Sequence, residues 1–199
     1  QLLAGLKIAS RLAHTPDMRL RARSVTTQVI VGAAGETDQE ILQTAWRLYR
    51  RLELARFYYS AFRPIPNTPL EGRPAAPLQR QNRLYQADFL LRSYGFRLEE
   101  IPFDPQGNLP ADHDPKQAWA LAHPYLFPVE VNRASREELL RVPGIGPKSA
   151  LRILRARRQT RLTELSHLRA LGVNVQRAAP FLLLNGRPPA RQLSLWPAG

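Results

Sequence analysis

The segment Val142–Ala150, with the sequence VPGIGPKSA, constrains the fold of this chain more than any other stretch. It lies between two helical patterns, Arg136–Arg141 and Ser149–Arg158. Two glycines one residue apart allow the backbone to turn tightly and to approach a ligand closely, because neither carries a Cβ atom. The proline that follows suits the first turn of a helix, where its missing N–H costs nothing. The segment therefore predicts a tight turn between two helices.

The N–H groups at this turn predict a site for an anion. Amides in the first turn of a helix have no partner within the helix, and they attract negatively charged groups. The segment resembles the helix-hairpin-helix element, which binds the DNA phosphate backbone without reading the base sequence. The resemblance implies DNA contacts from Gly144, Ile145, Gly146, Lys148, Ser149 and Arg152. The alternative interpretation is an ordinary tight turn between two packed helices.

The charge of the chain also indicates a nucleic-acid partner. The net charge is +13, and most of the basic residues are arginines, which bind phosphate through forked hydrogen bonds. The arginines that flank the glycine turn are Arg141, Arg152, Arg155, Arg157 and Arg158. Because each neutralised phosphate releases counterions, we expect DNA affinity to fall steeply with salt. Nothing resembles a recognition helix, so binding without sequence specificity is predicted.

The composition argues against several other kinds of site. The chain has no cysteine, which excludes disulfides, thiolate zinc sites and an iron–sulfur cluster held by its own cysteines. Its four histidines are scattered, so no metal site is predicted. No long apolar run and no basic amphipathic helix with a bulky apolar face is present, so no membrane partner is predicted. The N-terminus does not have the pattern of a signal peptide, and a cytoplasmic location is predicted.

The N-terminal half alternates strand and helix patterns. The predicted strands are Ser24–Val31, Ala55–Phe62 and Phe96–Ile101. One helix begins at Thr37 or Asp38, either of which can cap it, and a second helix covers Leu78–Tyr94. This alternation predicts an α/β fold in which parallel strands are joined by right-handed helical crossovers.

Two segments of this half resemble a known family. Thr26–Asp38, with the sequence TTQVIVGAAGETD, resembles a late barrel strand and loop of radical SAM enzymes, and Tyr59–Leu70 is similar to their next strand. Together with the C-terminal hairpin, the chain from Asp17 to Arg187 resembles DNA modification/repair radical SAM proteins. The resemblance implies a partial (β/α) barrel followed by a small all-α helix-hairpin-helix domain.

The same resemblance implies a cofactor site. It places Gln28, Gly35 and Glu36 near S-adenosylmethionine, whereas the alternative is that the loop 35–37 simply caps the next helix. The family holds a [4Fe–4S] cluster through a Cys-x-x-x-Cys-x-x-Cys motif, which this chain lacks. We therefore expect the chain to be the C-terminal portion of a longer protein whose missing N-terminal half of the barrel binds the cluster. No cofactor is expected to bind to this chain alone.

Four regions are predicted along the chain: residues 1–104 as the half barrel, 105–128 as a linker, 129–187 as the DNA-binding domain and 188–199 as a tail. Within the DNA-binding domain, Thr163–Val173 resembles a second, degenerate hairpin. Its Leu-Gly-Val turn is interpreted as lacking the first glycine, so we expect it to support the fold more than to bind phosphate.

Two alternative functions follow from the same residues. The first is a stand-alone module that binds DNA and performs no chemistry. The second is a helix-hairpin-helix glycosylase/lyase in which Lys148 is the nucleophile. That family also needs an aspartate in a Gly-x-Asp context after the hairpin, where this chain has Gly172, Val173 and Asn174. An amide cannot serve as the carboxylate, so the lyase is the less favoured alternative.

Overall fold

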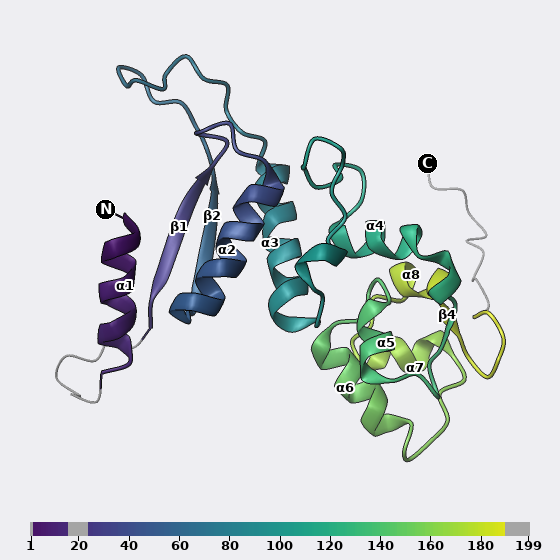
Figure 1. Cartoon of the computed structure of the whole chain (residues 1–199). Helices are drawn as coiled ribbons and strands as arrows, with labels where there is room; N and C mark the ends of the chain where they lie inside the picture. The colour runs from purple at the N-terminus through teal and green to yellow at the C-terminus, as the bar shows by residue number, and fades with distance from the viewer. Residues whose placement is uncertain (1, 16–23, 190–199) are drawn as a thin grey trace. The chain divides into compact units, whose positions relative to one another are not determined.

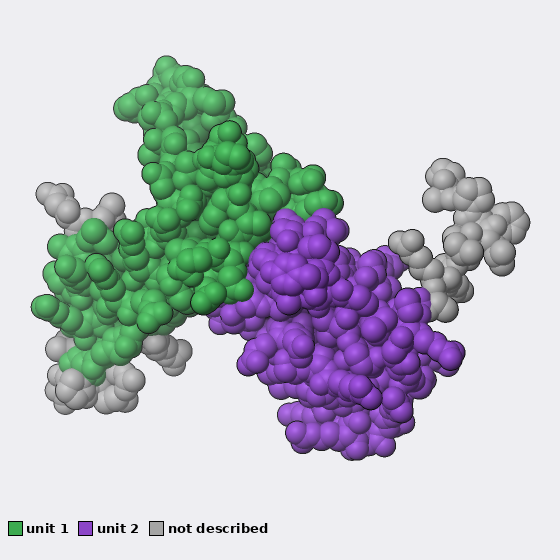
Figure 2. Space-filling view, turned by 45° about the vertical axis from the view of Figure 1, so that its right-hand side comes forward, with its two compact units in different colours: residues 1–88, 97–115 green, residues 89–96, 116–199 purple. Residues whose placement is uncertain are grey.

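The computed structural model describes residues 2–15 and 24–189 of the chain. These residues form helices and short strands that divide into two compact units, which Figure 2 distinguishes by colour. Unit 1 comprises Gln1–Asp88 and Arg97–Pro115, and unit 2 comprises Phe89–Phe96 and Lys116–Gly199. Most of the predicted tail, residues 190–199, lies outside the described residues. No helix among the described residues is both long and apolar enough to cross a membrane.

Unit 1 is built on two parallel strands. Strand β1 (Thr26–Val31) pairs with β2 (Arg56–Ala61) along its whole length, and helix α2 (Asp38–Leu52) connects them (Figure 1). Helix α1 (Leu2–Ala13) precedes β1, and α3 (Leu78–Ser93) follows β2. The predicted succession of strand, helix, strand and helix in this region is therefore confirmed.

The start of α2 shows why the helix begins where it does. The Thr37 hydroxyl oxygen accepts a hydrogen bond from the Glu40 N–H (3.2 Å), and the Glu40 carboxylate accepts one from the Thr37 N–H (2.8 Å). This reciprocal capping box satisfies amides that the helix itself leaves unpaired. Of the two predicted caps, Thr37 is thus the one used. The buried face of the helix includes Ile41, Leu42 and Ala45.

The predicted third strand, Phe96–Ile101, is wrong. Residues Leu98–Glu100 form the 3₁₀ helix η1 instead. The Glu100 carboxylate accepts a hydrogen bond from the Arg97 N–H (2.7 Å), and the Ile101 N–H donates to the Leu98 carbonyl (3.2 Å). These short-range bonds close a turn and leave the backbone unable to extend into a strand. Within the described residues, unit 1 therefore contains a two-stranded sheet and no closed barrel.

Unit 2 is mainly helical. Its elements in chain order are α4 (Pro115–Ala122), η2 (Pro124–Leu126), β3 (Val129–Glu130), α5 (Arg136–Arg141), α6 (Pro147–Ala156), α7 (Leu165–Ala170), α8 (Val175–Ala178), η3 (Ala179–Phe181) and β4 (Leu182–Leu183). Strands β3 and β4 pair in parallel, so the beginning and the end of the hairpin region are joined. The Ser135 hydroxyl caps α5 by accepting a hydrogen bond from the Glu138 N–H (3.1 Å).

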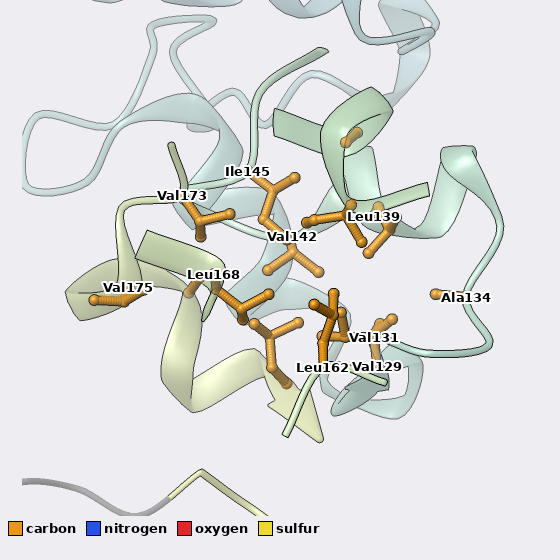
Figure 3. Close-up of a cluster of buried hydrophobic side chains, with 14 of the residues drawn as sticks. Val129, Val131, Ala134, Leu139, Val142, Ile145, Leu162, Leu168, Val173 and Val175 are labelled. Atoms are coloured by element: carbon orange, nitrogen blue, oxygen red, sulfur yellow. The ribbon is translucent and has the colours of Figure 1, made fainter. Parts of the chain in front are cut away.

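One apolar core holds the helices of unit 2 together (Figure 3). Leu139, Val142, Ile145 and Leu168 are each at most 1% exposed and come from α5, the hairpin and α7. Removing a side chain of this size from water contributes about 1.5–3 kcal/mol. The core includes the apolar residue between the two glycines, so burial of that side chain determines the position of the turn.

Candidate nucleic-acid interface

The first hairpin connects α5 to α6 through residues 142–146. Gly144 has a φ angle of +86°, a backbone conformation that disfavours residues with a Cβ atom. A Cβ atom at Gly144 would also overlap with the backbone carbonyl oxygen of Asn174, whose own N–H donates to the Gly144 carbonyl (3.0 Å). Gly144 therefore permits both the turn and a close contact with a second backbone segment.

Gly146 leaves the start of α6 without a side-chain cap. It occupies the N-cap position, and no side chain of its own can accept a hydrogen bond from the first turn. The first intrahelical bond runs from the Ala150 N–H to the Gly146 carbonyl (2.8 Å), so the amides of Lys148 and Ser149 precede it. Pro147 has no N–H. The helix therefore leaves its first amides free for a negatively charged group, and the exposed Lys148 belongs to the same first turn.

The residues predicted to contact DNA differ in whether their side chains are exposed. Lys148 and Arg152 are at least partly exposed, whereas the Ile145 side chain is 1% exposed and lies in the core. Ser149 is buried, and its hydroxyl donates to the Gly172 carbonyl (2.7 Å). Ile145 and Ser149 can therefore contact a phosphate only through their backbone amides. The roles of these residues in DNA binding stay predictions.

The arginines around the hairpin divide into two groups. The Arg157 guanidinium donates to the carbonyls of Val131 (3.0 Å) and Ala134 (2.6 Å), so it supports the fold. The Arg141 guanidinium lies 3.8 Å from the centre of the Phe96 ring and is only partly exposed. The arginines that remain exposed on α6 and just after it are Arg152, Arg155 and Arg158.

A basic hollow lies at the C-terminal end of α6. Its volume is about 340 Å³, and it is lined by Asn132, Arg133, Arg157, Arg158, Gln159, Thr160 and Arg161. None of the described residues that line it is acidic. Arg133, Arg158 and Arg161 are exposed, and none of these three forms a salt bridge with another described residue. The hollow extends the positive surface of unit 2 beyond the hairpin.

A second hairpin connects α7 to α8 and repeats the backbone of the first. Gly172 has a φ angle of +82°, which matches Gly144, and Val173 is buried as Ile145 is. Asn174 occupies the N-cap position of α8, where Gly146 stands in the first hairpin. The second hairpin therefore retains its first glycine and lacks the second, so the prediction that the first is missing is wrong.

Asn174 changes what the second hairpin can bind. Its side-chain oxygen accepts a hydrogen bond from the Arg177 N–H (3.3 Å), so one amide of the first turn of α8 is already satisfied. Helix α8 is also only four residues long, and a 3₁₀ turn follows it. Together, α8 and η3 span Val175–Phe181. This hairpin is suited to packing against Gly144 rather than to holding a phosphate.

Lys116 contacts the first hairpin, and no sequence pattern predicted this contact. It is 7% exposed, and its Nζ donates to the Ile145 carbonyl (2.6 Å). Burial, together with the nearby positive charge of Arg141, lowers the pKa of the Lys116 ammonium to about 7. Lys116 and Ile145 are 29 residues apart in the chain, so no local pattern in the sequence indicates their contact.

The residues predicted to lie near S-adenosylmethionine are in unit 1. Gln28 is exposed on β1, and Gly35 is exposed with a φ angle of +81°. The Glu36 carboxylate accepts hydrogen bonds from the N–H groups of Gly32 (2.5 Å) and Ala34 (2.9 Å). Burial alone would raise the pKa of Glu36, but these amides lower it below its usual range. The carboxylate therefore stabilises its own loop, and a cofactor role for these residues stays a prediction.

The described residues contain no group of three or more His, Asp or Glu side chains arranged to bind a metal ion. With no cysteine in the chain, the residues present do not fit the iron–sulfur cluster that the radical SAM resemblance implies.

Comparison with known protein families matches one segment of the chain. Residues 129–156, from β3 to the end of α6, match the family described as helix-hairpin-helix motif. Comparison with curated proteins found no significant match. Comparison with solved structures found none either. The matched segment contains the uncapped helix start and indicates nucleic-acid binding. None of these findings supports the resemblance to radical SAM proteins.

Proposed function

We propose that unit 2 binds DNA by holding backbone phosphates at the first hairpin, without reading the base sequence. The observation that carries this proposal is the start of α6. Gly146 provides no side-chain cap, and the helix opens within a segment that matches the helix-hairpin-helix motif. A helix of ten residues with free amides at its start attracts a negatively charged oxygen. Lys148 adds a charge that a phosphate neutralises.

The exposed arginines extend this contact along the surface. Arg152 lies one turn after Lys148 on α6, Arg155 lies near the end of the helix, and Arg158 lies just after it. Arginine binds phosphate through two parallel hydrogen bonds, which favours the sugar–phosphate backbone as the ligand. Backbone amides and arginines that contact phosphates fix the position of a protein on DNA but carry no information about the bases. This supports binding that does not depend on sequence.

The proposal is tested by fluorescence anisotropy on a labelled duplex of about 20 base pairs, long enough to hold more than one helical turn. Gly146→Leu places a side chain against the Tyr94 hydroxyl, which lies 3.3 Å from the position of an added Cβ atom. The start of α6 must then shift, which displaces the amides that would hold a phosphate, and we expect affinity to fall more than about tenfold. Lys148→Ala removes one phosphate contact, and we expect the salt slope of log K to become shallower by about 0.9.

Arg73→Ala is the matched control, because Arg73 is an exposed residue of unit 1 whose loss also removes one positive charge. We expect its affinity and salt slope to stay close to those of the unmodified protein. Unchanged titrations for both Gly146→Leu and Lys148→Ala would refute the assignment of the hairpin as the DNA contact.

A second proposal concerns the longer protein to which this chain would belong. We propose that unit 1 derives from a radical SAM protein of DNA modification or repair, supported by the parallel pairing of β1 with β2 across α2. The cofactor would then be S-adenosylmethionine with a cluster bound by residues upstream of Gln1. The test is the coding sequence upstream. An in-frame strand followed by Cys-x-x-x-Cys-x-x-Cys supports this origin, and an upstream sequence without it argues against it.

A further inference from the structure

Lys116 places a charged group on the inner side of the DNA-binding hairpin. A buried ammonium is destabilising unless it gains hydrogen bonds or other favourable contacts. Here Nζ donates to the Ile145 carbonyl (2.6 Å) and lies 4.7 Å from the centre of the Tyr94 ring. The Tyr94 hydroxyl in turn lies 3.3 Å from the position that a Cβ atom at Gly146 would occupy. Lys116 and Tyr94 therefore support the two residues that precede α6.

The geometry of the peptide bond links Lys116 to the anion site. The Ile145 carbonyl and the Gly146 N–H belong to one planar trans peptide, so they point in opposite directions. Because the carbonyl is bonded to Lys116, the Gly146 N–H is directed away from Lys116. The Gly146 N–H donates no hydrogen bond to another described residue, and it lies beside the free amides of the α6 start. Lys116 thus orients an amide that a phosphate can use.

We propose that Lys116 is a positioning residue of the DNA-binding hairpin, and that DNA binding draws a proton onto its amine. This inference rests on the proposed function of the hairpin. The ammonium form makes a stronger, charge-assisted hydrogen bond to the Ile145 carbonyl than the neutral amine does. A bound phosphate also favours the positive form of a nearby amine. DNA and proton therefore each strengthen the binding of the other.

The groups around Lys116 determine the pH range of this effect. Arg141 of α5 is permanently charged and opposes a second positive charge, and burial opposes it further, so the pKa of Lys116 falls to about 7. Burial raises the pKa of the Tyr94 hydroxyl, which stays neutral. His123, which directly follows α4, stacks on Trp119 with 4.2 Å between ring centres. The expected window is therefore centred near neutral pH.

The experiment measures duplex affinity from about pH 6.5 to about pH 8.5 at constant salt, where ordinary lysines stay charged. We expect the affinity of the unmodified protein to fall about fivefold across this range as Lys116 loses its proton. Lys116→Met should bind more weakly at the lower pH and show a flat profile. Its salt slope should stay unchanged, because a residue that only positions amides neutralises no phosphate, in contrast to Lys148→Ala.

Two further variants distinguish the titration of Lys116 from that of a neighbouring group. Lys116→Arg keeps the charge at every pH, and we expect it to restore affinity relative to Lys116→Met without pH dependence. His123→Gln should keep the pH profile of the unmodified protein. A flat profile for His123→Gln, or an unchanged profile for Lys116→Met, would assign the effect to another group and overturn the inference.

Thermal unfolding provides a readout that needs no DNA. The lowered pKa means that the unfolded chain binds more protons than the folded one above about pH 7, so this group makes the melting temperature rise with pH. DNA affinity should instead fall as the pH rises.

If Lys116→Met does not fold, a second experiment uses the unmodified protein. Titration calorimetry near pH 8 in two buffers of different ionisation enthalpy measures directly the protons taken up when DNA binds. Zero uptake on binding overturns the inference, whereas the absence of any DNA binding by the unmodified protein refutes the proposed function itself.

Discussion

Gly144 and Gly172 hold equivalent positions in the two hairpins of unit 2, with φ angles of +86° and +82°. The apolar residue that follows each of them, Ile145 or Val173, is buried in the same core. The next residue differs, because Gly146 begins α6 whereas Asn174 begins α8. The two hairpins therefore share a backbone and differ at the N-cap of the second helix.

That difference teaches how one motif can be used in two ways. Asn174 accepts a hydrogen bond from an amide of its own helix, whereas Gly146 cannot. The residue two positions further on is Lys148 in the first hairpin and the uncharged Gln176 in the second. A side chain that caps the helix competes with a phosphate for the same amides. The first hairpin is thus open to a ligand, and the second is closed by its own sequence.

The largest expected loss of stability comes from a substitution that disrupts the contact between the two hairpins. Gly144→Ala adds a Cβ atom that overlaps with the Asn174 carbonyl oxygen, and it does so at a positive φ angle. Since neither backbone segment can move without disturbing the core, we expect a loss of more than about 3 kcal/mol of stability. Urea unfolding monitored by circular dichroism measures the free energy of unfolding.

Gly172→Ala is the matched control for this prediction. Its positive φ angle is similar, but the nearest atom to an added Cβ is the Arg152 Nη1 at 3.0 Å, at the end of a flexible side chain. We expect a loss of about 1 kcal/mol, mainly from the backbone conformation. Equal losses for the two alanine variants would contradict the view that Gly144 is needed for the close approach of the hairpins.

An intermediate effect distinguishes two neighbouring residues of α6. Ser149→Ala removes the hydrogen bond from the Ser149 hydroxyl to the Gly172 carbonyl (2.7 Å), which joins α6 to the second hairpin. We expect a loss of about 1–2 kcal/mol of stability, because a carbonyl loses its partner. Lys148→Ala should leave the free energy of unfolding within about 0.5 kcal/mol, since the Lys148 side chain is not part of the buried core. A smaller loss of stability for Ser149→Ala than for Lys148→Ala would show that the hydrogen bond from Ser149 to Gly172 does not stabilise the fold.

The smallest effect is expected from a substitution that makes the second hairpin resemble the first. Asn174→Gly removes the cap of α8, and we expect the free energy of unfolding to fall by about 0.3 kcal/mol. DNA affinity should change less than about twofold, because α8 is too short to offer a strong helix terminus and no lysine follows it. An increase in affinity to the level expected from two equal sites would show that the cap alone closes this hairpin.

The sequence predicted the local elements well where short-range patterns decide them. The glycine spacing and the proline at the start of α6 specify the first hairpin within nine residues, and Thr37 and Ser135 cap the helices that follow them. The third strand was predicted wrongly because Phe96 and Ile101 are buried whether the backbone is extended or turned. Burial of apolar residues does not by itself distinguish a strand from a 3₁₀ turn.

The candidate site shows the same division between local and distant information. The pattern of arginines predicts a basic surface, but it does not separate Arg157, which binds the Val131 and Ala134 carbonyls, from the exposed Arg158. Arg157 and Arg158 are adjacent in the chain and are the same type of residue. The partners of Arg157 lie 26 and 23 residues away. Which arginine supports the fold is therefore decided by the carbonyls that the folded chain brings close to it.

The sequence by itself determined the hairpin, its free amides and the positive charge around it, because backbone preferences and capping act within a few residues. The tertiary structure alone decided that Gly144 faces the Asn174 carbonyl and that Lys116 bonds to Ile145. These contacts join segments about 30 residues apart, and burial in the common core brings them together. Partners separated by that distance are chosen by packing, which no local pattern encodes.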